Sequence, residues 1–135
     1  MLNNYWPLAK DRPKATEGEI TFSNWYNKAR KIVISRTLAG TASGNTTIIS
    51  DDVTKEITKI QTQPGKDIFI FGSPTVAQLL MRLNLIDVYW VFVNPAIFGK
   101  GIPLFLNIDN KIQLQLVTTK QFSNGEFALN YIVNK

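Results

Sequence analysis

Short apolar runs alternate with helix-like stripes through the middle of the chain, between residues 31 and 93. The apolar runs predict four strands at Lys31–Ser35, Thr46–Ile49, Asp67–Phe71 and Asp87–Val93, because a continuous apolar run suits a strand covered on both faces. The alternation of strands and helices indicates an α/β domain, with a mostly parallel sheet and crossover helices that flank it.

The first of the intervening helices is predicted from three apolar residues, Val53, Ile57 and Ile60, which share one helical face. Ser50 is its expected N-cap, and the two aspartates that follow place negative charge in the first turn, where the helix dipole favours it. Pro64-Gly65 ends the helix.

The second helix is predicted to begin at Ser73-Pro74, because serine is a preferred N-cap and proline suits the first helical position. Asn84 is expected to close it. The apolar stripe of this helix consists of Val76, Leu79, Leu80 and Leu83.

The two ends of the chain have a different character. Residues 1–10 suggest a helix that stops at Trp6-Pro7, residues 11–18 a loop, and residues 19–29 a further helix.

At the other end, apolar residues alternate with polar ones in Ile112–Leu116 and again in Phe127–Val133, the period of a half-buried strand. Ser123-Asn124-Gly125 between them is a strong turn signal, so an antiparallel hairpin is expected to end the sheet. We expect residues 1–135 to form a single domain.

The composition of the chain restricts the kinds of functional site that it can form more than it restricts the fold. The chain has no cysteine and no histidine, which excludes disulfides, thiolate nucleophiles and most metal sites, so no metal is expected. The net charge is +5, but the basic residues are scattered, which argues against nucleic acid as a partner. Apolar runs such as Val88–Val93 are too short to span a membrane, and a cytoplasmic protein is expected.

The strongest candidate for ligand contact is the turn between the third strand and the second helix: Gly72, Ser73, Pro74, Thr75 and Val76. Glycine lets a ligand approach the backbone, and the free amides at a helix start attract anions. A plain capped helix after a tight turn would account for the same residues.

A second candidate lies at the end of the first strand, where Ser35, Arg36 and Thr37 offer two hydroxyls and a guanidinium to a phosphate. A solvated strand end is the alternative interpretation. The loop Asn94–Gly101 carries Lys100 between two glycines, an arrangement that could contact an anion. A flexible loop with a solvated lysine would account for the same residues. The acidic residues form no pair within an apolar segment, so catalytic residues are not assigned.

Taken together, several stretches resemble the dihydrofolate-reductase-like proteins related to the reductase (C-terminal) domain of the riboflavin-biosynthesis protein RibD. The matching stretches, in the family's order, are Tyr5-Trp6-Pro7, Lys31–Leu38, Gly65–Ser73, Leu83–Asp87, Asn94–Phe105 and Phe122–Gly125.

The resemblance implies an NADPH-dependent reductase that transfers hydride to a small heterocycle, either an aminouracil-type riboflavin precursor or a folate-like compound. It places Ser35, Arg36 and Thr37 at the 2′-phosphate of the cofactor and Gly72–Val76 at its pyrophosphate. It also implies a homodimer. Family members open with a strand, a helix and a second strand before the point that matches Met1, so a non-catalytic binding or assembly domain that retains the reductase fold stays open as an alternative.

Overall fold

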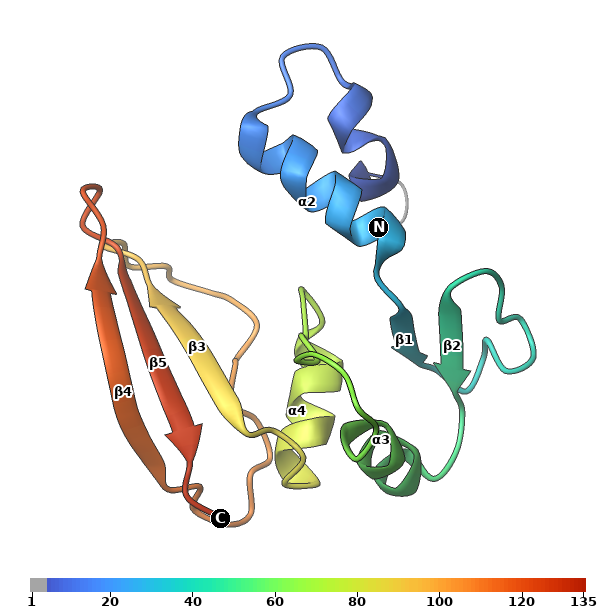
Figure 1. Ribbon diagram of the computed structural model, residues 1–135. Helices are drawn as coiled ribbons and strands as arrows, with labels where there is room; N and C mark the ends of the chain where they lie inside the picture. The colour runs from blue at the N-terminus through green and yellow to red at the C-terminus, as the bar shows by residue number, and fades with distance from the viewer. Residues whose placement is uncertain (1–4) are drawn as a thin grey trace. The chain divides into compact units, whose positions relative to one another are not determined.

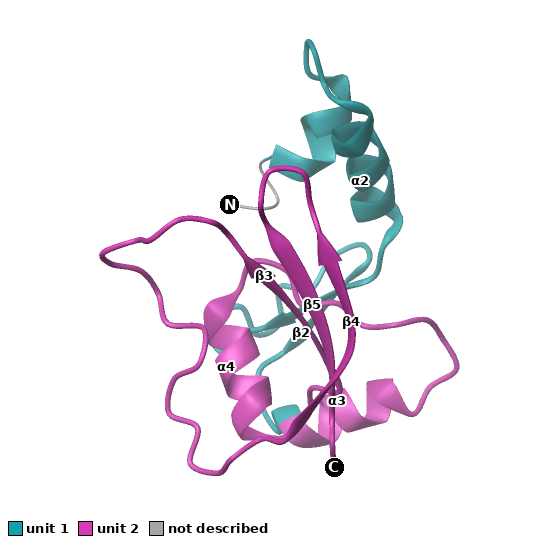
Figure 2. Ribbon diagram, turned by 90° about the vertical axis from the view of Figure 1, so that its left-hand side faces the viewer, with its two compact units in different colours: residues 1–53 teal, residues 54–135 magenta. Residues whose placement is uncertain are grey.

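The computed structural model describes residues 5–135 (Figure 1). The chain divides into two compact units between Val53 and Thr54 (Figure 2). The part of the expected N-terminal helix that falls on residues 1–4 lies outside this description. The expectation of a single domain over residues 1–135 stays a prediction.

The first unit opens with a 3-10 helix, η1 (Trp6–Asp11), followed by helix α2 (Glu17–Lys28). The α-helical assignment ends at Tyr5, directly before the expected stop at Trp6-Pro7, and η1 begins at Trp6. Proline is accepted in the first turn of η1, because the N–H group that it lacks would have no partner within the helix there. Helix α2 starts two residues earlier than expected because Thr16 caps it.

Two small residues let η1 and α2 pack closely. Ala9 and Ser23 are both fully buried, and the Ser23 hydroxyl donates a hydrogen bond to the carbonyl oxygen of Trp6 at 2.7 Å. The Trp6 ring packs against Phe22, with the ring centroids 4.4 Å apart. The N-terminal part of the chain is therefore a well-packed helical hairpin.

Strands β1 (Lys31–Ile34) and β2 (Thr46–Ile49) form a parallel pair in register from Lys31 opposite Thr46 to Ile34 opposite Ile49. The connecting loop is anchored at its end by Asn45, whose side-chain amide donates to the carbonyl of Ala29 at 2.6 Å. This pair confirms the two predicted strands.

Helix α3 (Val53–Gln61) begins the second half of the α/β pattern and buries Ile57 on its inner face. Ser50 was expected to be its N-cap, but the helix begins three residues later, and the Ser50 hydroxyl instead donates to the carboxylate of Asp51. Asp52 has a positive φ of 46°, which turns the backbone out of the helical path, so neither aspartate lies in the first turn.

Helix α4 (Pro74–Arg82) follows the prediction closely, with Ser73 at the N-cap position and proline in its first turn. It ends where expected, because Asn84 adopts a positive φ of 53°. The amide of Asn84 donates to the carbonyl of Met81, and that of Leu85 to the carbonyl of Leu80, which is a Schellman motif.

The chain ends in a three-stranded antiparallel sheet, in the order β3 (Val88–Val93), β5 (Phe127–Val133), β4 (Leu114–Gln121). Figure 2 shows the three strands side by side. The predicted hairpin is confirmed, with Gly125 in the turn at φ 85° and a bulge in β4 between Leu116 and Thr118.

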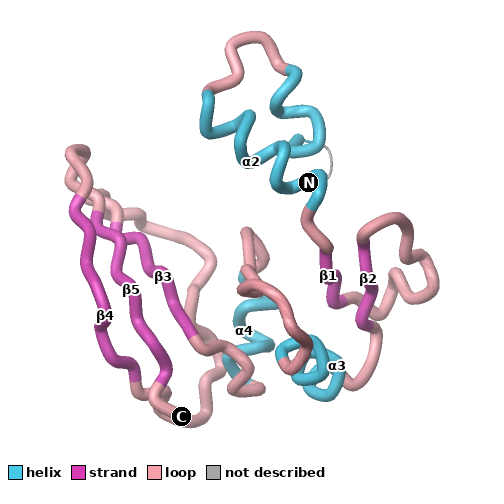
Figure 3. The backbone as a smooth tube through the Cα atoms, in the orientation of Figure 1, coloured by secondary structure: helices cyan, strands magenta, loops and turns pink. Residues whose placement is uncertain are grey.

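Two predictions about the sheet are wrong. Strand β3 was expected to be buried, but it is an edge strand, and Val88, Trp90 and Phe92 on one of its faces are exposed. Asp67–Phe71 was expected to be a strand, but it has no strand partner among residues 5–135 and is drawn as loop between α3 and α4 (Figure 3).

The fold is therefore mixed α/β, but the expected mostly parallel sheet is not observed. The described residues form a two-stranded parallel pair and a separate three-stranded antiparallel sheet. The physical reason is that Asp67–Phe71, which would continue the parallel sheet, lacks a neighbouring strand with which to exchange hydrogen bonds.

Candidate functional site

The first candidate segment lies where β1 ends. The amide of Ser35 donates to the carbonyl of Ile49 at 3.0 Å, so this residue is still held by the parallel pair. The hydroxyls of Ser35 and Thr37 lie 3.2 Å apart and share a hydrogen bond. The structure thus brings the two predicted hydroxyl residues together at the carboxyl end of a parallel strand, the end at which ligands bind in open α/β sheets.

Arg36 lies between these hydroxyls in sequence and is exposed. Among residues 5–135, the ion pair that forms is between Lys135 and Asp87, so no described carboxylate neutralises Arg36. An exposed guanidinium beside two hydroxyls presents several donors to a bound phosphate.

The second candidate segment is the turn that leads into α4. Gly72 has a φ of 58°, in the left-handed region that glycine adopts at no steric cost. A β-carbon built at Gly72 would have no heavy atom of the protein within 4 Å, apart from the adjoining residues. The space next to this backbone is therefore open to a ligand.

Amide donors gather where α4 begins. The Ser73 hydroxyl makes no capping hydrogen bond to the helix, so it does not satisfy the amides of the first turn. Pro74 has no amide hydrogen, which leaves Thr75 and Val76 as the donors within that turn. With the positive end of the helix dipole behind them, these donors suit an anion.

The loop that carries Lys100 belongs to the same unit as α4. Gln78, which is buried on α4, donates from its side-chain amide to the carbonyl of Pro103 at 2.7 Å. This contact ties the end of the loop to the helix. Gln78 was not predicted from the sequence to have a role. The signal that could have identified it is its position as a polar residue among the apolar residues of the helix stripe.

Titratable groups supply few candidates for acid–base chemistry. No group of three or more carboxylates able to hold a metal occurs within the described part of the chain. Burial raises the pKa of Tyr89, and that of Tyr26, but neither lies in a candidate segment. Catalytic residues therefore stay unassigned.

The most strongly shifted carboxyl group belongs to Glu19. A hydrogen bond from the Tyr5 hydroxyl, with further bonds from the amide and hydroxyl of Thr16, lowers the Glu19 pKa to about 2. Arg12 lies over the Tyr5 ring, 4.7 Å from its centroid. These contacts hold η1 against α2, so this cluster stabilises the fold rather than forming a reactive site.

The two candidate segments belong to different units, Ser35–Thr37 to the first and Gly72–Val76 to the second. Within each segment the geometry suits an anion, and the assignment of these residues to ligand binding stays a prediction. No helix in the described part of the chain is long and apolar enough to cross a membrane.

Two solved structures share this fold. A candidate riboflavin biosynthesis protein from Shewanella sp. PV-4 superposes with a TM-score of 0.68 over 88% of this chain and 71% of its own, at 15% identity. A pyrimidine reductase-like protein from Corynebacterium diphtheriae superposes with a TM-score of 0.57 over 91% of this chain and 48% of its own, at 18% identity. The chain thus shares its mixed α/β fold with both of these structures.

Sequence comparison assigns the family. The model of the RibD C-terminal domain matches residues 1–127, and the chain belongs to this family. Two relatives come from Bacillus subtilis (strain 168), both of them uncharacterized proteins. YyaP is 31% identical over 126 residues, and YwjB is 30% identical over 86 residues.

The chain is shorter than these relatives. The match with YyaP covers 92% of this chain but 64% of YyaP, and the match with YwjB covers 64% of this chain and 49% of YwjB. The chain thus spans between about half and two-thirds of the length of the curated relatives that it matches.

Proposed function

We propose that this protein is an NADPH-dependent reductase, or the cofactor-binding part of one, that acts on a small heterocyclic substrate. Membership of the RibD C-terminal domain family supports reductase chemistry. When bound, the nicotinamide supplies the hydride, and the residues of the protein bind and orient the cofactor and its substrate.

A single observation carries the choice of cofactor: Arg36, exposed and without an ion-pair partner among the described residues, stands between two hydroxyls at the end of β1. A planar guanidinium binds a phosphate through paired charge-assisted hydrogen bonds. NADPH carries a phosphate on its adenosine ribose that NADH lacks, so this segment favours NADPH.

The turn at Gly72 supports the same proposal through a different part of the cofactor. A pyrophosphate needs backbone donors and room for close approach, and Gly72 with the amides of Thr75 and Val76 offers both. In this assignment Ser35, Arg36 and Thr37 select the 2′-phosphate, and Gly72–Val76 hold the pyrophosphate.

The test is to measure the affinities of the Arg36→Ala variant for NADPH and NADH by isothermal titration calorimetry. A hydrogen bond to a charged group contributes about 1.5–3 kcal/mol, so NADPH should bind at least about ten-fold more weakly, while NADH should be almost unaffected. The matched control is Arg82→Ala, which removes an exposed arginine from the last turn of α4. Equal affinities of the wild-type protein for the two cofactors would contradict the proposal.

The substrate class follows from the family and not from the described residues. An aminouracil-type precursor of riboflavin and a folate-like compound are both consistent with the proposal. Reduction of the substrate with oxidation of NADPH, followed at 340 nm, distinguishes them.

A non-catalytic binding or assembly domain that retains the reductase fold is the second candidate. It is favoured by one observation: the chain spans between about half and two-thirds of the length of the curated relatives that it matches. Cofactor binding without turnover of either substrate would support this second candidate.

A further inference from the structure

A long loop, residues 94–113, connects β3 to β4 and contains neither helix nor strand. Loops of this length are uncommon in compact domains, and active-site lids and binding loops account for many of them. Figure 2 shows the loop that follows β3 extending outward and returning beside α4. Both the loop and α4 belong to the unit Thr54–Lys135, so their contacts can be compared directly.

Two prolines fix the ends of the first part of this loop. Pro95 lies against the turn between β4 and β5, because a β-carbon added at Gly125 would be 3.4 Å from its Cγ atom. Pro103 is held by α4, since the side-chain amide of Gln78 donates to the Pro103 carbonyl at 2.7 Å. The residues between the two prolines, 96–102, thus form a strap that is attached at both ends.

Gln78 occupies a position where an apolar residue would need no partner. Its side chain is 8% exposed, and Leu80 and Met81 on the same helix are also buried. A buried amide that lacks a hydrogen-bond partner destabilises a fold, whereas a buried leucine does not. The glutamine therefore links the packing of α4 to the position of the strap.

The tip of the strap combines exposed apolar side chains with one positive charge. Ile97 is fully exposed, and Phe98 and Ile102 are 77% and 76% exposed. Lys100 lies between two glycines, and no carboxylate of the described residues forms an ion pair with it. Exposed apolar side chains favour burial, and glycines allow the backbone to change conformation. This composition is typical of a segment that closes over a ligand.

The attachment at Gln78 brings Lys100 within reach of the start of α4. An α-helix rises about 1.5 Å per residue, so Gln78 lies roughly 6 Å along the axis from Pro74, where α4 begins. Lys100 precedes Pro103 by three residues, a stretch that spans at most about 10 Å when it is extended. The four-carbon stem of the lysine adds further length. The ammonium group can therefore reach an anion at the first turn of α4.

We propose that the strap closes over the turn at Gly72 and the start of α4 when a phosphorylated ligand binds there, and that Lys100 then donates to the phosphate. Gln78 is a positioning residue, because it fixes the end of the strap from which Lys100 reaches. On closing, the apolar side chains of the tip leave water and shield the phosphate, which strengthens its hydrogen bonds. The inference rests on the proposed function, since the ligand is the pyrophosphate of the cofactor.

The first experiment measures the affinities of the full chain for NADPH and for inorganic pyrophosphate by isothermal titration calorimetry. Lys100→Gln should weaken both by about ten-fold, because a hydrogen bond from a charged group is lost. The matched control is Lys55→Gln, which removes an exposed lysine from α3 in the same unit and should change neither affinity. Since Lys100 is exposed, this substitution leaves the fold intact.

A double-mutant cycle tests whether Gln78 acts through Lys100. Gln78→Met keeps the length of the side chain but removes its donor, and it should weaken pyrophosphate binding about five-fold in the wild type and very little in the Lys100→Gln background. Gln61→Met is the control, since it removes a similar hydrogen bond, from Gln61 to the carbonyl of Leu85 at 3.1 Å. It should leave the affinity unchanged in both backgrounds, and circular dichroism checks that each variant is folded.

Hydrogen–deuterium exchange followed by mass spectrometry measures the closure itself. The amides of residues 97–102 should exchange at least about ten-fold more slowly at saturating NADPH, because closure protects them from solvent. The amides of residues 107–111, in the second part of the same loop, should change little. The Lys100→Gln variant should lose most of the protection.

The possible failures are distinguishable. Binding of either probe without slower exchange in the strap would overturn the inference and leave the proposed function standing. Additive losses from Gln78→Met and Lys100→Gln would show that Gln78 stabilises the helix without positioning the lysine. If neither NADPH nor pyrophosphate binds to the wild-type chain, the inference falls together with the proposed function.

Discussion

At the scale of single residues, backbone conformation separates the candidate ligand contacts from ordinary loop positions. Gly72 and Asn84 both adopt a positive φ, but for different reasons. Asn84 closes α4 by satisfying helix carbonyls, whereas Gly72 precedes the helix and leaves open space beside its backbone. Substitutions at position 72 can therefore test separately whether ligand binding needs the positive φ or the open space beside the backbone.

We expect Gly72→Asn to bind NADPH at least ten-fold more weakly while its melting temperature stays close to that of the wild type. Asparagine tolerates a positive φ, but its side chain occupies the space that a phosphate needs. Gly72→Val should lose binding and also stability, by about 1–2 kcal/mol, because a β-branched residue is strained in that conformation. Calorimetric titration and thermal melts separate the two effects, and normal binding by Gly72→Asn would show that the turn is merely structural.

A pH dependence follows from Glu19. Its pKa in the folded protein is lowered from 4.5 to about 2, first by the hydrogen bond from Tyr5 and then by those from Thr16. A lowered pKa means that the carboxylate stabilises the fold above pH 4.5 and that this contribution is lost as the pH falls toward 2. The wild type should therefore melt higher than Glu19→Gln at pH 6, and the difference should vanish near pH 2. A difference that is independent of pH would contradict this assignment.

At the scale of elements, capping decides where the helices begin. Helix α2 starts at a capping box, in which the Thr16 hydroxyl accepts from the Glu19 amide at 3.2 Å and the Glu19 carboxylate accepts from the Thr16 amide at 2.8 Å. Helix α3 has no such device at Ser50, and it begins only after the turn at Asp52. A serine before aspartates was therefore a weaker signal than a threonine followed three residues later by a glutamate.

Removing the cap should shorten and destabilise α2. Thr16→Ala is expected to lower the free energy of unfolding of the helical hairpin by about 1 kcal/mol, the usual loss for such a cap. Thr21→Ala provides the control, because Thr21 is exposed within the same helix and alanine favours helix. Far-UV circular dichroism during urea unfolding measures both, and equal effects of the two substitutions would contradict a capping role.

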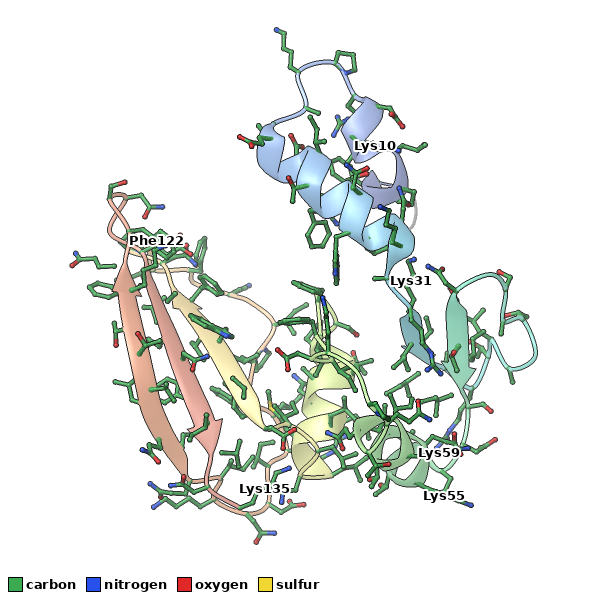
Figure 4. All side chains as sticks on the ribbon, in the orientation of Figure 1. Lys10, Lys31, Lys55, Lys59, Phe122 and Lys135 are labelled. Atoms are coloured by element: carbon green, nitrogen blue, oxygen red, sulfur yellow. The ribbon has the colours of Figure 1, made fainter. Side chains whose placement is uncertain are left out.

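At the scale of the whole molecule, charge is dispersed and apolar surface is abundant. Labelled lysines occur on η1, at β1, on α3 and at the C-terminus, rather than along one element (Figure 4). Lys135 pairs with Asp87, but both side chains are largely exposed, so this ion pair contributes little. Association of the molecule is therefore expected to depend on its apolar edges and faces.

We expect the protein to form a homodimer through β4, the second edge of the antiparallel sheet. Leu116 and Val117 on this strand are more than half exposed, and an apolar edge strand favours pairing with another chain. Light scattering coupled to gel filtration should give twice the mass of the chain, and Leu116→Lys should return it to a monomer. A stable wild-type monomer at micromolar concentration would rule the dimer out.

Local sequence patterns predicted most of the elements because their causes are local. The stripe and proline of α4, the stop at Asn84, the parallel strands β1 and β2 and the turn at Gly125 each depend on residues within a few positions of one another. The same holds for the candidate ligand contacts at Ser35 and Gly72, because one follows the end of a strand and the other precedes the start of a helix.

The assembly of the sheet was decided only by tertiary structure, because a strand exists through its hydrogen-bonding partners and not through its own residues. Asp67–Phe71 has the composition of a buried strand, yet the described chain provides no neighbour, so it stays unpaired. Val88–Val93 has the same composition but lies at a sheet edge, with one face exposed. The sequence by itself therefore determined the family and most of the helices and strands, and it supplied the residues proposed for phosphate contact. Pairing in space decided which apolar segments became strands and how many sheets they formed.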